Sequence, residues 1–490
     1  MSYVTPADRS QYVLMNTLDD LVPSNHPVHL IEAIVEKVVA DNPNHFGRPT
    51  IGDVGRPEYS PPTLLKLYLY GFVHGIRSSR RLEAETRRNI EVMWLLGMLS
   101  PDHWTVSQFR KEHRENIKFV TKEFRRFLHD TGYIKGERVS IDGSKMKANA
   151  KREMLTLAKI EKRMRQVDEK LEEYLNKLAE NDAREDVLEE LEQTDDTTER
   201  ERQLVEKIVE VQQQLEALQQ QKALLEQTGN SPLSLADPEA KLMRTRDGKM
   251  PAYNVQLVVD DAHKMIADSE VLTEQNDVAA LPTMVHSLKE ELGIVPKEIL
   301  ADTGYYNPAL IEHVESNNTD LQCYIPLPEK PSDRDHVTFT YDAERNQYTC
   351  SEGKPLMLFT RHKQRRGKSL ASGYRGTECT GCHLRHECTT SKRGRIVYRY
   401  HNQQWRDGYK SRMSTPAARD IARLRKSLAE HPFGTIKCLG GKIPLLLRGV
   451  LNVATEINLY TFAYNLKRLI NSETIASLLE KVREHRWAPA

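Results

Sequence analysis

The first 135 residues carry apolar side chains at the spacing of α-helices and predict an all-helical N-terminal domain, residues 1–135. The helical spacing is clearest in Leu64, Leu65, Tyr68, Phe72 and Ile76. Ser78 or Ser79 stands where it can cap a second helix, and Thr105 stands where it can cap a short third one. A turn at 100–102 separates the two short helices.

Strand patterns begin after residue 136 and predict an α/β sheet. They fall at 139–143, 253–259, 265–267, 298–302 and 322–326, and helical patterns fall at 277–292 and 307–315. Alternating strands and helices are typical of an α/β fold. The first and the fourth of these strands end in Asp142 and Asp302. We therefore expect both carboxylates at neighbouring strand ends, where open sheets bind ligands.

A long polar stretch interrupts the sheet pattern after its first strand. From Ile160 the apolar residues alternate by four and three as far as Leu178, and the same seam returns from Leu204 to Leu225. A turn pattern lies between them at 193–198. The sequence predicts an inserted antiparallel coiled-coil hairpin, residues 154–229, that serves dimerisation or spacing; a solvated amphipathic hairpin explains the same pattern equally well.

Length and composition indicate a folded chain with more than one unit. A chain of 490 residues exceeds the size at which one hydrophobic core usually stops growing. The net charge of +1 conceals a segregation, because acidic residues crowd at 168–210 and basic residues at 77–88 and 361–399. The polar N-terminus resembles no signal peptide, and no apolar run approaches a membrane span, so we expect a cytoplasmic protein.

Four of the six cysteines fall in a Cys-rich segment that we place in an inserted subdomain, residues 330–399. The set that can bind one tetrahedral structural Zn²⁺ is Cys350, Cys379, Cys382 and Cys388. His383 or His386 can replace one cysteine in that set. A reduced, partly buried cluster without metal is the alternative. Cys323 and Cys438 are expected to be buried apolar fillers.

Three acidic residues stand in distinctive surroundings, although 70 acidic residues make acidity alone uninformative. Asp142 lies in IDGSK, Asp302 in ADTGYY and Glu430 in EHPFGTIK. These segments resemble the DDE transposases of bacterial insertion sequences, in the group with an InsH-like N-terminal domain. The resemblance covers almost the whole chain and extends to segments 55–59, 68–71, 75–83, 101–110, 237–240, 253–256, 276–277 and 465–468.

The resemblance implies an RNase H-like catalytic core, residues 136–153, 236–329 and 400–470, followed by a tail at 471–490. It also implies a catalytic triad of Asp142, Asp302 and Glu430 that holds two Mg²⁺ or Mn²⁺ ions. Carboxylate oxygens suit these hard cations, and a pair of them stabilises the attacking and leaving oxygens of a phosphodiester. Lys437 matches the family's downstream lysine, whereas Arg423 stands at its tyrosine position and Lys426 at its arginine position.

The function that follows is a transposase that binds the element's ends, cleaves the backbone and joins the 3′ ends to target DNA. A nuclease without strand transfer and an idle DNA-binding regulator are the alternatives. Double-stranded DNA is the expected partner, bound by a homodimer associated with the nucleoid. The residues expected to contact DNA phosphates, unless they are ordinary solvated charges, are Arg77, Arg80, Arg81, Arg110, Lys145, Lys147, Lys426 and Lys437. Other basic candidates near the core are Arg244, Arg246 and Lys249.

Overall fold

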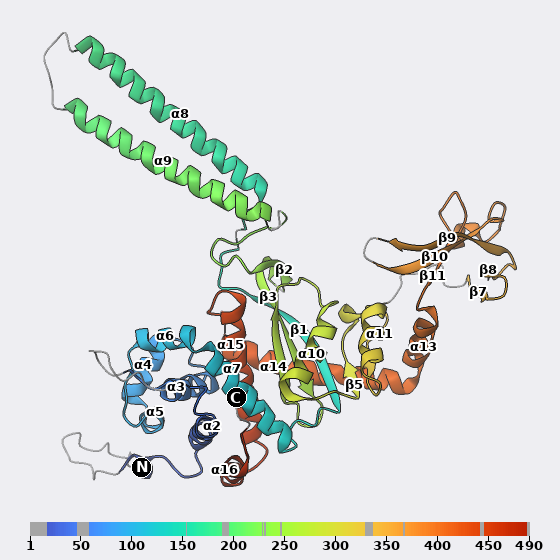
Figure 1. The fold of residues 1–490 in the computed structure, drawn as a ribbon, viewed down its shortest axis with the longest axis horizontal. Helices are drawn as coiled ribbons and strands as arrows, with labels where there is room; N and C mark the ends of the chain where they lie inside the picture. Colours follow the sequence, from blue (N-terminus) through green and yellow to red (C-terminus); the bar gives the residue numbers. More distant parts are fainter. Residues whose placement is uncertain are drawn as a thin grey trace, which may run out of the picture.

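The structure is a computed structural model of the chain (Figure 1). It describes residues 17–46, 58–152, 154–188, 196–227, 229, 232–245, 247–328, 337–365, 368–441 and 445–487. Arg246 and part of the turn expected at 193–198 lie outside the described residues. In the part of the chain that is described, no helix has both the length and the apolar composition needed to span a membrane.

The N-terminal part is helical, as the apolar spacing predicts. Its helices are α1 (Leu18–Leu21), α2 (Val28–Asp41), α3 (Pro61–Val73), α4 (Ser79–Arg88), α5 (Ile90–Leu95), α6 (His103–Glu112) and α7 (Arg114–Asp130). Helix α3 is the most buried, because ten consecutive residues from Leu64 to Val73 are buried. Ser78 is the N-cap residue of α4 but makes no side-chain capping hydrogen bond.

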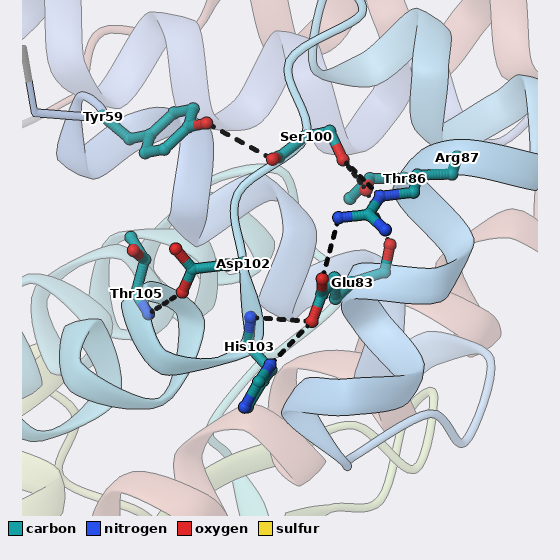
Figure 2. Close-up of polar contacts among 8 residues, drawn as sticks. All are labelled: Tyr59, Glu83, Thr86, Arg87, Ser100, Asp102, His103 and Thr105. Carbon is teal, nitrogen blue, oxygen red and sulfur yellow. Dashed lines mark hydrogen bonds and ion pairs between the residues drawn. The ribbon is translucent and has the colours of Figure 1, made fainter. Parts of the chain in front are cut away.

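The cap of α6 differs from the predicted one. Thr105 lies inside the helix, and the Asp102 carboxylate accepts its backbone N–H at 2.8 Å (Figure 2). Figure 2 also shows Glu83 of α4 accepting from the backbone N–H of His103 at 3.0 Å and contacting its ring Nδ1 at 2.8 Å. Because this carboxylate binds the first residue of α6, it fixes the turn at 100–102 against α4.

The central sheet has both antiparallel and parallel neighbours. Its strands are β1 (Arg138–Lys147), β2 (Lys241–Thr245), β3 (Gly248–Asp260), β4 (Ile266–Leu272), β5 (Glu298–Leu300) and β6 (Gln322–Tyr324). The order is β2-β3-β1-β5-β6, with β4 also paired to β3. Strand β3 is antiparallel to β1, β2 and β4, whereas β1, β5 and β6 run parallel. All five predicted strands are present, and β2 is an addition that the sequence pattern did not predict.

Helices flank this sheet and continue to the C-terminal end of the described chain. They are η1 (Thr303–Tyr305), α10 (Ala280–Leu292), α11 (Pro308–Asn317), α13 (Gln403–Ser414), α14 (Pro416–Gly440), α15 (Val450–Ile470) and α16 (Ile475–Glu484). Helix α14 packs against β1, β3 and β5, and α15 contacts α3, α7 and β4. One hydrophobic core therefore runs from the N-terminal helices through α15 into the sheet.

Two additions project from the core (Figure 1). The first consists of α8 (Leu157–Leu188) and α9 (Asp196–Gln227), which lie side by side and leave the core beside the backbone pair Leu155–Leu233. The second is an antiparallel sheet in the order β11-β10-β9-β8-β7, together with the short helix α12 (Arg385–Cys388). Its strands are β7 (Phe339–Asp342), β8 (Gln347–Cys350), β9 (Pro355–Arg365), β10 (Lys368–Gly376) and β11 (Ile396–Tyr400).

A buried carboxylate ties the N-terminal helices to the C-terminal ones. Glu456 of α15 is fully buried and accepts backbone N–H groups of Leu446 and Leu447 at 2.9 and 3.1 Å. Arg77 approaches it at 3.5 Å and also donates to Tyr460 and to the last carbonyl of α14, at Gly440. Burial raises the pKa of Glu456, and the two backbone N–H groups, Arg110 and Arg77 oppose that rise.

Glu456→Ala is expected to lower the free energy of unfolding by about 3 kcal/mol or more, because it leaves two buried backbone donors and the Arg77 guanidinium without their acceptor. Glu456→Gln should cost less, since its amide oxygen still accepts from the loop at 446–447. Urea denaturation measures both, with Glu484→Gln on the exposed end of α16 as the control. A loss below about 1 kcal/mol in Glu456→Ala would contradict this role.

Candidate active site

Asp142 lies within β1, and Asp302 lies just beyond β5, the parallel neighbour of β1. The prediction that the first strand ends at Asp142 is wrong, because β1 continues to Lys147 through its pairing with β3. Strand β1 pairs with β5 in parallel register, and the last pair joins Ser140 to Leu300. Each aspartate is two residues beyond that pair, so the register sets the two carboxylates next to each other. Asp302 also caps η1, where its Oδ1 accepts the backbone N–H of Gly304 at 2.8 Å. The cap fixes the direction of this side chain.

The electrostatic environment of Asp142 reflects burial and a second carboxylate. Its side chain is 19% exposed, and burial is the main cause that raises its pKa to about 6. The Arg425 guanidinium, 3.5 Å from Oδ1, opposes that rise, whereas the negative charges of Asp302 and Asp277 add to it. Burial and the two neighbouring carboxylates thus outweigh the effect of Arg425 on the pKa of Asp142.

Asp277 is an acidic residue of this site that sequence reasoning did not single out. Its carboxylate lies 2.7 and 2.8 Å from Lys145 Nζ. Asn254 and Gln256 of β3 donate to its Oδ1 at 2.8 and 2.9 Å. Segments 253–256 and 276–277 belong to the family resemblance, which was the one available signal. Lys145 is therefore engaged at the site, although it was expected to contact DNA.

Glu430 lies on the helix that covers this edge of the sheet. On α14, Arg425 contacts Asp142, and Lys437 Nζ donates to Ser144 Oγ at 2.8 Å. Glu430 stands between them in the helix and is exposed. Among the residues that the structure describes, no three His, Cys, Asp or Glu side chains are arranged to hold a metal ion. The structure thus brings Asp142 and Asp302 together and leaves Glu430 on the adjacent helix.

Two of the arginines expected to bind DNA are packed inside the protein. Arg77 makes the contacts with Glu456 and Tyr460 described above. Arg110 lies with its guanidinium carbon 5.7 Å from the centre of the Tyr68 ring, and its Nε and Nη1 are buried. Arg77 contacts Glu456 of α15, and the charge of Arg110 also acts on Glu456, which is distant from both arginines in the sequence. That distance is the reason why local spacing could not reveal their position.

The other basic candidates divide between the surface and the site. The exposed ones are Arg80, Arg81, Lys147 and Lys426. Lys145 and Lys437 are half-buried beside the carboxylates. Arg425, rather than its neighbour Lys426, contacts Asp142, and the sequence pattern did not distinguish the two residues.

The four clustered cysteines line one hollow of the smaller sheet. Two of them begin tight turns, because Cys350 O accepts from Gly353 N–H at 2.9 Å and Cys379 O accepts from Cys382 N–H at 3.4 Å. Burial raises the pKa of the Cys388 thiol; Arg395 opposes that rise, and the other three cysteines add to it. The four thiols are thus electrostatic neighbours.

The remaining histidines and cysteines of the predictions are placed differently. His383 and His386 are 72% and 74% exposed and approach Glu352 and Glu387 at 3.7 and 3.1 Å. Cys323 is buried, as expected for an apolar filler. Cys438 is exposed, so the same prediction for it is wrong. It lies in the last turns of α14, on a side that no core residue covers.

Two protein families match separate parts of the chain. Residues 16–112 match the family described as Transposase domain (DUF772), and residues 349–470 match the Transposase DDE domain. Searches of curated proteins and of solved structures each found no match. The first match spans α1 to α6, and the second contains the four clustered cysteines, strands β9 to β11 and Glu430.

These two domains define the class of the protein as a transposase. The second match is to a DDE domain, so the two matches together support a DDE-type transposase of an insertion sequence. The predicted resemblance to that family is therefore confirmed. The bacterial origin and the InsH-like grouping stay predictions.

Gly143→Ala is expected to disrupt the site, because a Cβ there would overlap Gln256 Nε2 and lie 2.8 Å from Asp277 Oδ1. We expect the free energy of unfolding to fall by about 1–3 kcal/mol, the usual cost of overpacking. Gly408→Ala in α13 is the control, since nothing lies within 4 Å of its Cβ and alanine favours a helix. Equal stability of the two variants in urea denaturation would show that Gly143 has room.

Proposed function

We propose that this protein binds the ends of an insertion sequence, cleaves the phosphodiester backbone and joins the freed 3′ ends to target DNA. The observation that carries the proposal is the pair Asp142 and Asp302, each two residues beyond the last pairing of β1 with β5, in a chain with two transposase domain matches. In that scheme Glu430 of α14 is the third member of the catalytic triad. Double-stranded DNA is the substrate, and a homodimer holds the paired ends.

The sheet order supports an RNase H-like catalytic core. Strand β1 lies between an antiparallel neighbour, β3, and a parallel one, β5, and the parallel strand β6 follows at the edge. That fold requires a first strand in the centre of the sheet. It also requires an antiparallel hairpin on one side of this strand and parallel strands on the other. The Cys-rich sheet and the hairpin of α8 and α9 are then additions to this core.

The residues at the site fit divalent cations such as Mg²⁺ or Mn²⁺. Asp142 and Asp302 present hard carboxylate oxygens, and their mutual repulsion, which contributes to the raised pKa of Asp142, is what a cation relieves. Asp142 and Asp302 would hold two such ions, and Glu430 would be the third ligand. Bound there, the ions would activate the attacking oxygen and stabilise the leaving one.

The basic side chains near the site have separate tasks in this proposal. Arg425 orients Asp142 through its ion pair, and Lys437 anchors α14 to β1 through Ser144. Lys147 at the end of β1 and Lys426 in the middle of α14 are exposed and would neutralise DNA phosphates. Arg80 and Arg81 of α4 would do the same for the N-terminal helices.

Asp142→Asn is expected to reduce cleavage of DNA that carries the element's ends by about 10³-fold or more, because a neutral amide cannot bind the cations. Binding of the same DNA, measured by gel mobility shift, should persist. Asp261→Asn is the matched control, because Asp261 pairs with Arg138 at 3.4 Å near the other end of β1. Retained cleavage in Asp142→Asn would refute the assignment.

The same assay with supercoiled target DNA separates the alternatives. Joined products favour the transposase, hydrolysis alone favours a nuclease, and DNA binding without cleavage by the wild-type protein favours a regulator. We expect joined products.

The cysteine cluster is proposed to bind one structural Zn²⁺. Its four thiols surround one hollow, and the Arg395 backbone N–H lies 3.5 Å from Cys379 Sγ, where it can stabilise a thiolate. Elemental analysis of the purified protein should give about one zinc per chain. The double substitution Cys379→Ser/Cys382→Ser should abolish it, whereas Cys438→Ser should not. Near-zero zinc in the wild-type protein would leave the reduced cluster without metal.

A further inference from the structure

Asp277 is held by donors from β1, the strand that carries Asp142, and from its neighbour β3. It lies in the connection between β4 and α10, and its side chain is 16% exposed. Lys145 of β1 contacts both of its oxygens, and Asn254 and Gln256 of β3 donate to one of them. Hydrogen bonds that involve ionised groups are stronger and shorter than neutral ones, so this arrangement is well defined.

The same cluster reaches the loop that carries Asp302. The Tyr305 hydroxyl donates to Gln256 Oε1, and Tyr305 is fully buried. Tyr305 ends η1, the turn that Asp302 caps. Gln256 therefore links Asp277 on one side to the Asp302 turn on the other.

The two glycines of the site show how closely these groups pack. A Cβ on Gly304 would lie 2.9 Å from Asp302 Oδ1 and 3.7 Å from Asp277 Oδ2, so both carboxylates face the same residue. A Cβ on Gly143 would lie 2.8 Å from Asp277 Oδ1 and 3.1 Å from Asn254 Oδ1. Asp277 therefore packs closely against Gly143, and Gly304 lies close to both Asp277 and Asp302.

Charge separates the task of Asp277 from that of Asp142 and Asp302. Lys145 lies against Asp277 and compensates its charge, whereas Asp142 faces a second carboxylate. Asp277 Oδ1 also accepts hydrogen bonds from three donors. It is thus placed to hold other residues rather than to bind a cation itself.

We propose that Asp277 is a positioning residue that, through Lys145 and the Gln256–Tyr305 link, holds Asp302 next to Asp142 in the geometry that binds a divalent cation. This inference rests on the proposed function, because it assigns the cation to Asp142 and Asp302. It gives Lys145 a task inside the site: its charge neutralises Asp277 and is kept away from the carboxylate pair. Groups that orient metal ligands typically change metal affinity by about 10–100-fold when removed.

The test is binding of Mn²⁺ to the full-length protein without DNA, followed by electron paramagnetic resonance. Asp277→Asn should weaken Mn²⁺ binding by about 10-fold or more. The neutral amide no longer compensates the charge of Lys145, so the Lys145 ammonium group repels the metal ion. The double substitution Asp277→Asn/Lys145→Met should recover most of the affinity, since it removes both charges and keeps the amide oxygen that Asn254 and Gln256 need. Tyr305→Phe should weaken binding several-fold through loss of its hydrogen bond to Gln256. Asp261→Asn is the control and should bind as the wild type does.

The outcomes separate this inference from the proposed function. If Asp302→Asn abolishes Mn²⁺ binding but Asp277→Asn and Tyr305→Phe leave it unchanged, the positioning role is wrong and the carboxylate pair stands. If Asp142→Asn and Asp302→Asn also bind as the wild type does, the proposed cation site itself fails. A double variant as weak as Asp277→Asn would overturn the role of Lys145, because a general loss of packing gives no recovery. Circular dichroism on each variant identifies unfolding, and Tyr305→Phe keeps the test decisive should Asp277→Asn fail to fold.

Discussion

Two negative charges held next to each other at one edge of a sheet are the constraint on which the rest of the site depends. The parallel register of β1 and β5 sets Asp142 level with Asp302, and partial burial prevents water from screening their repulsion. The surrounding residues answer this constraint in two ways. Arg425 places one positive charge beside Asp142. Lys145 pairs with a third acidic group, Asp277, and compensates its negative charge. The remaining deficit is what we propose divalent cations fill.

The N-terminal helices are joined to this site through packing and a buried charge. Helix α15 contacts α3 and α7 on one side and β4 on the other, and its Glu456 binds the loop that follows α14. Arg77 completes the link by donating to the last turn of α14. The N-terminal helices and the helix that carries Glu430 are therefore joined by direct contacts.

Local patterns predicted what local physics determines, and failed where the partner was distant. Local sequence patterns predicted five of the six central strands and several helices, among them α10 and α11, because these depend on neighbouring residues. They predicted wrongly that the first strand ends at Asp142, because the pairing with β3 extends β1 to Lys147. The burial of Arg77 and Arg110 was missed, since Glu456 lies more than 300 positions away and a surface arginine has the same local pattern. Asp277 was missed for the same reason. Its role comes from β1 and β3 meeting the β4–α10 connection, which no single segment reveals.

The most direct measurement of the central claim is metal-directed cleavage of the protein itself. Fe²⁺ replaces Mg²⁺ in many carboxylate sites, and with ascorbate and peroxide it generates radicals that cut the polypeptide beside its ligands. Fragments that end near residues 142, 302 and 430, suppressed by excess Mg²⁺, are the expected result. Cuts near 142 and 302 alone would remove Glu430 from the triad, and cuts only at other positions would contradict the proposed cation site.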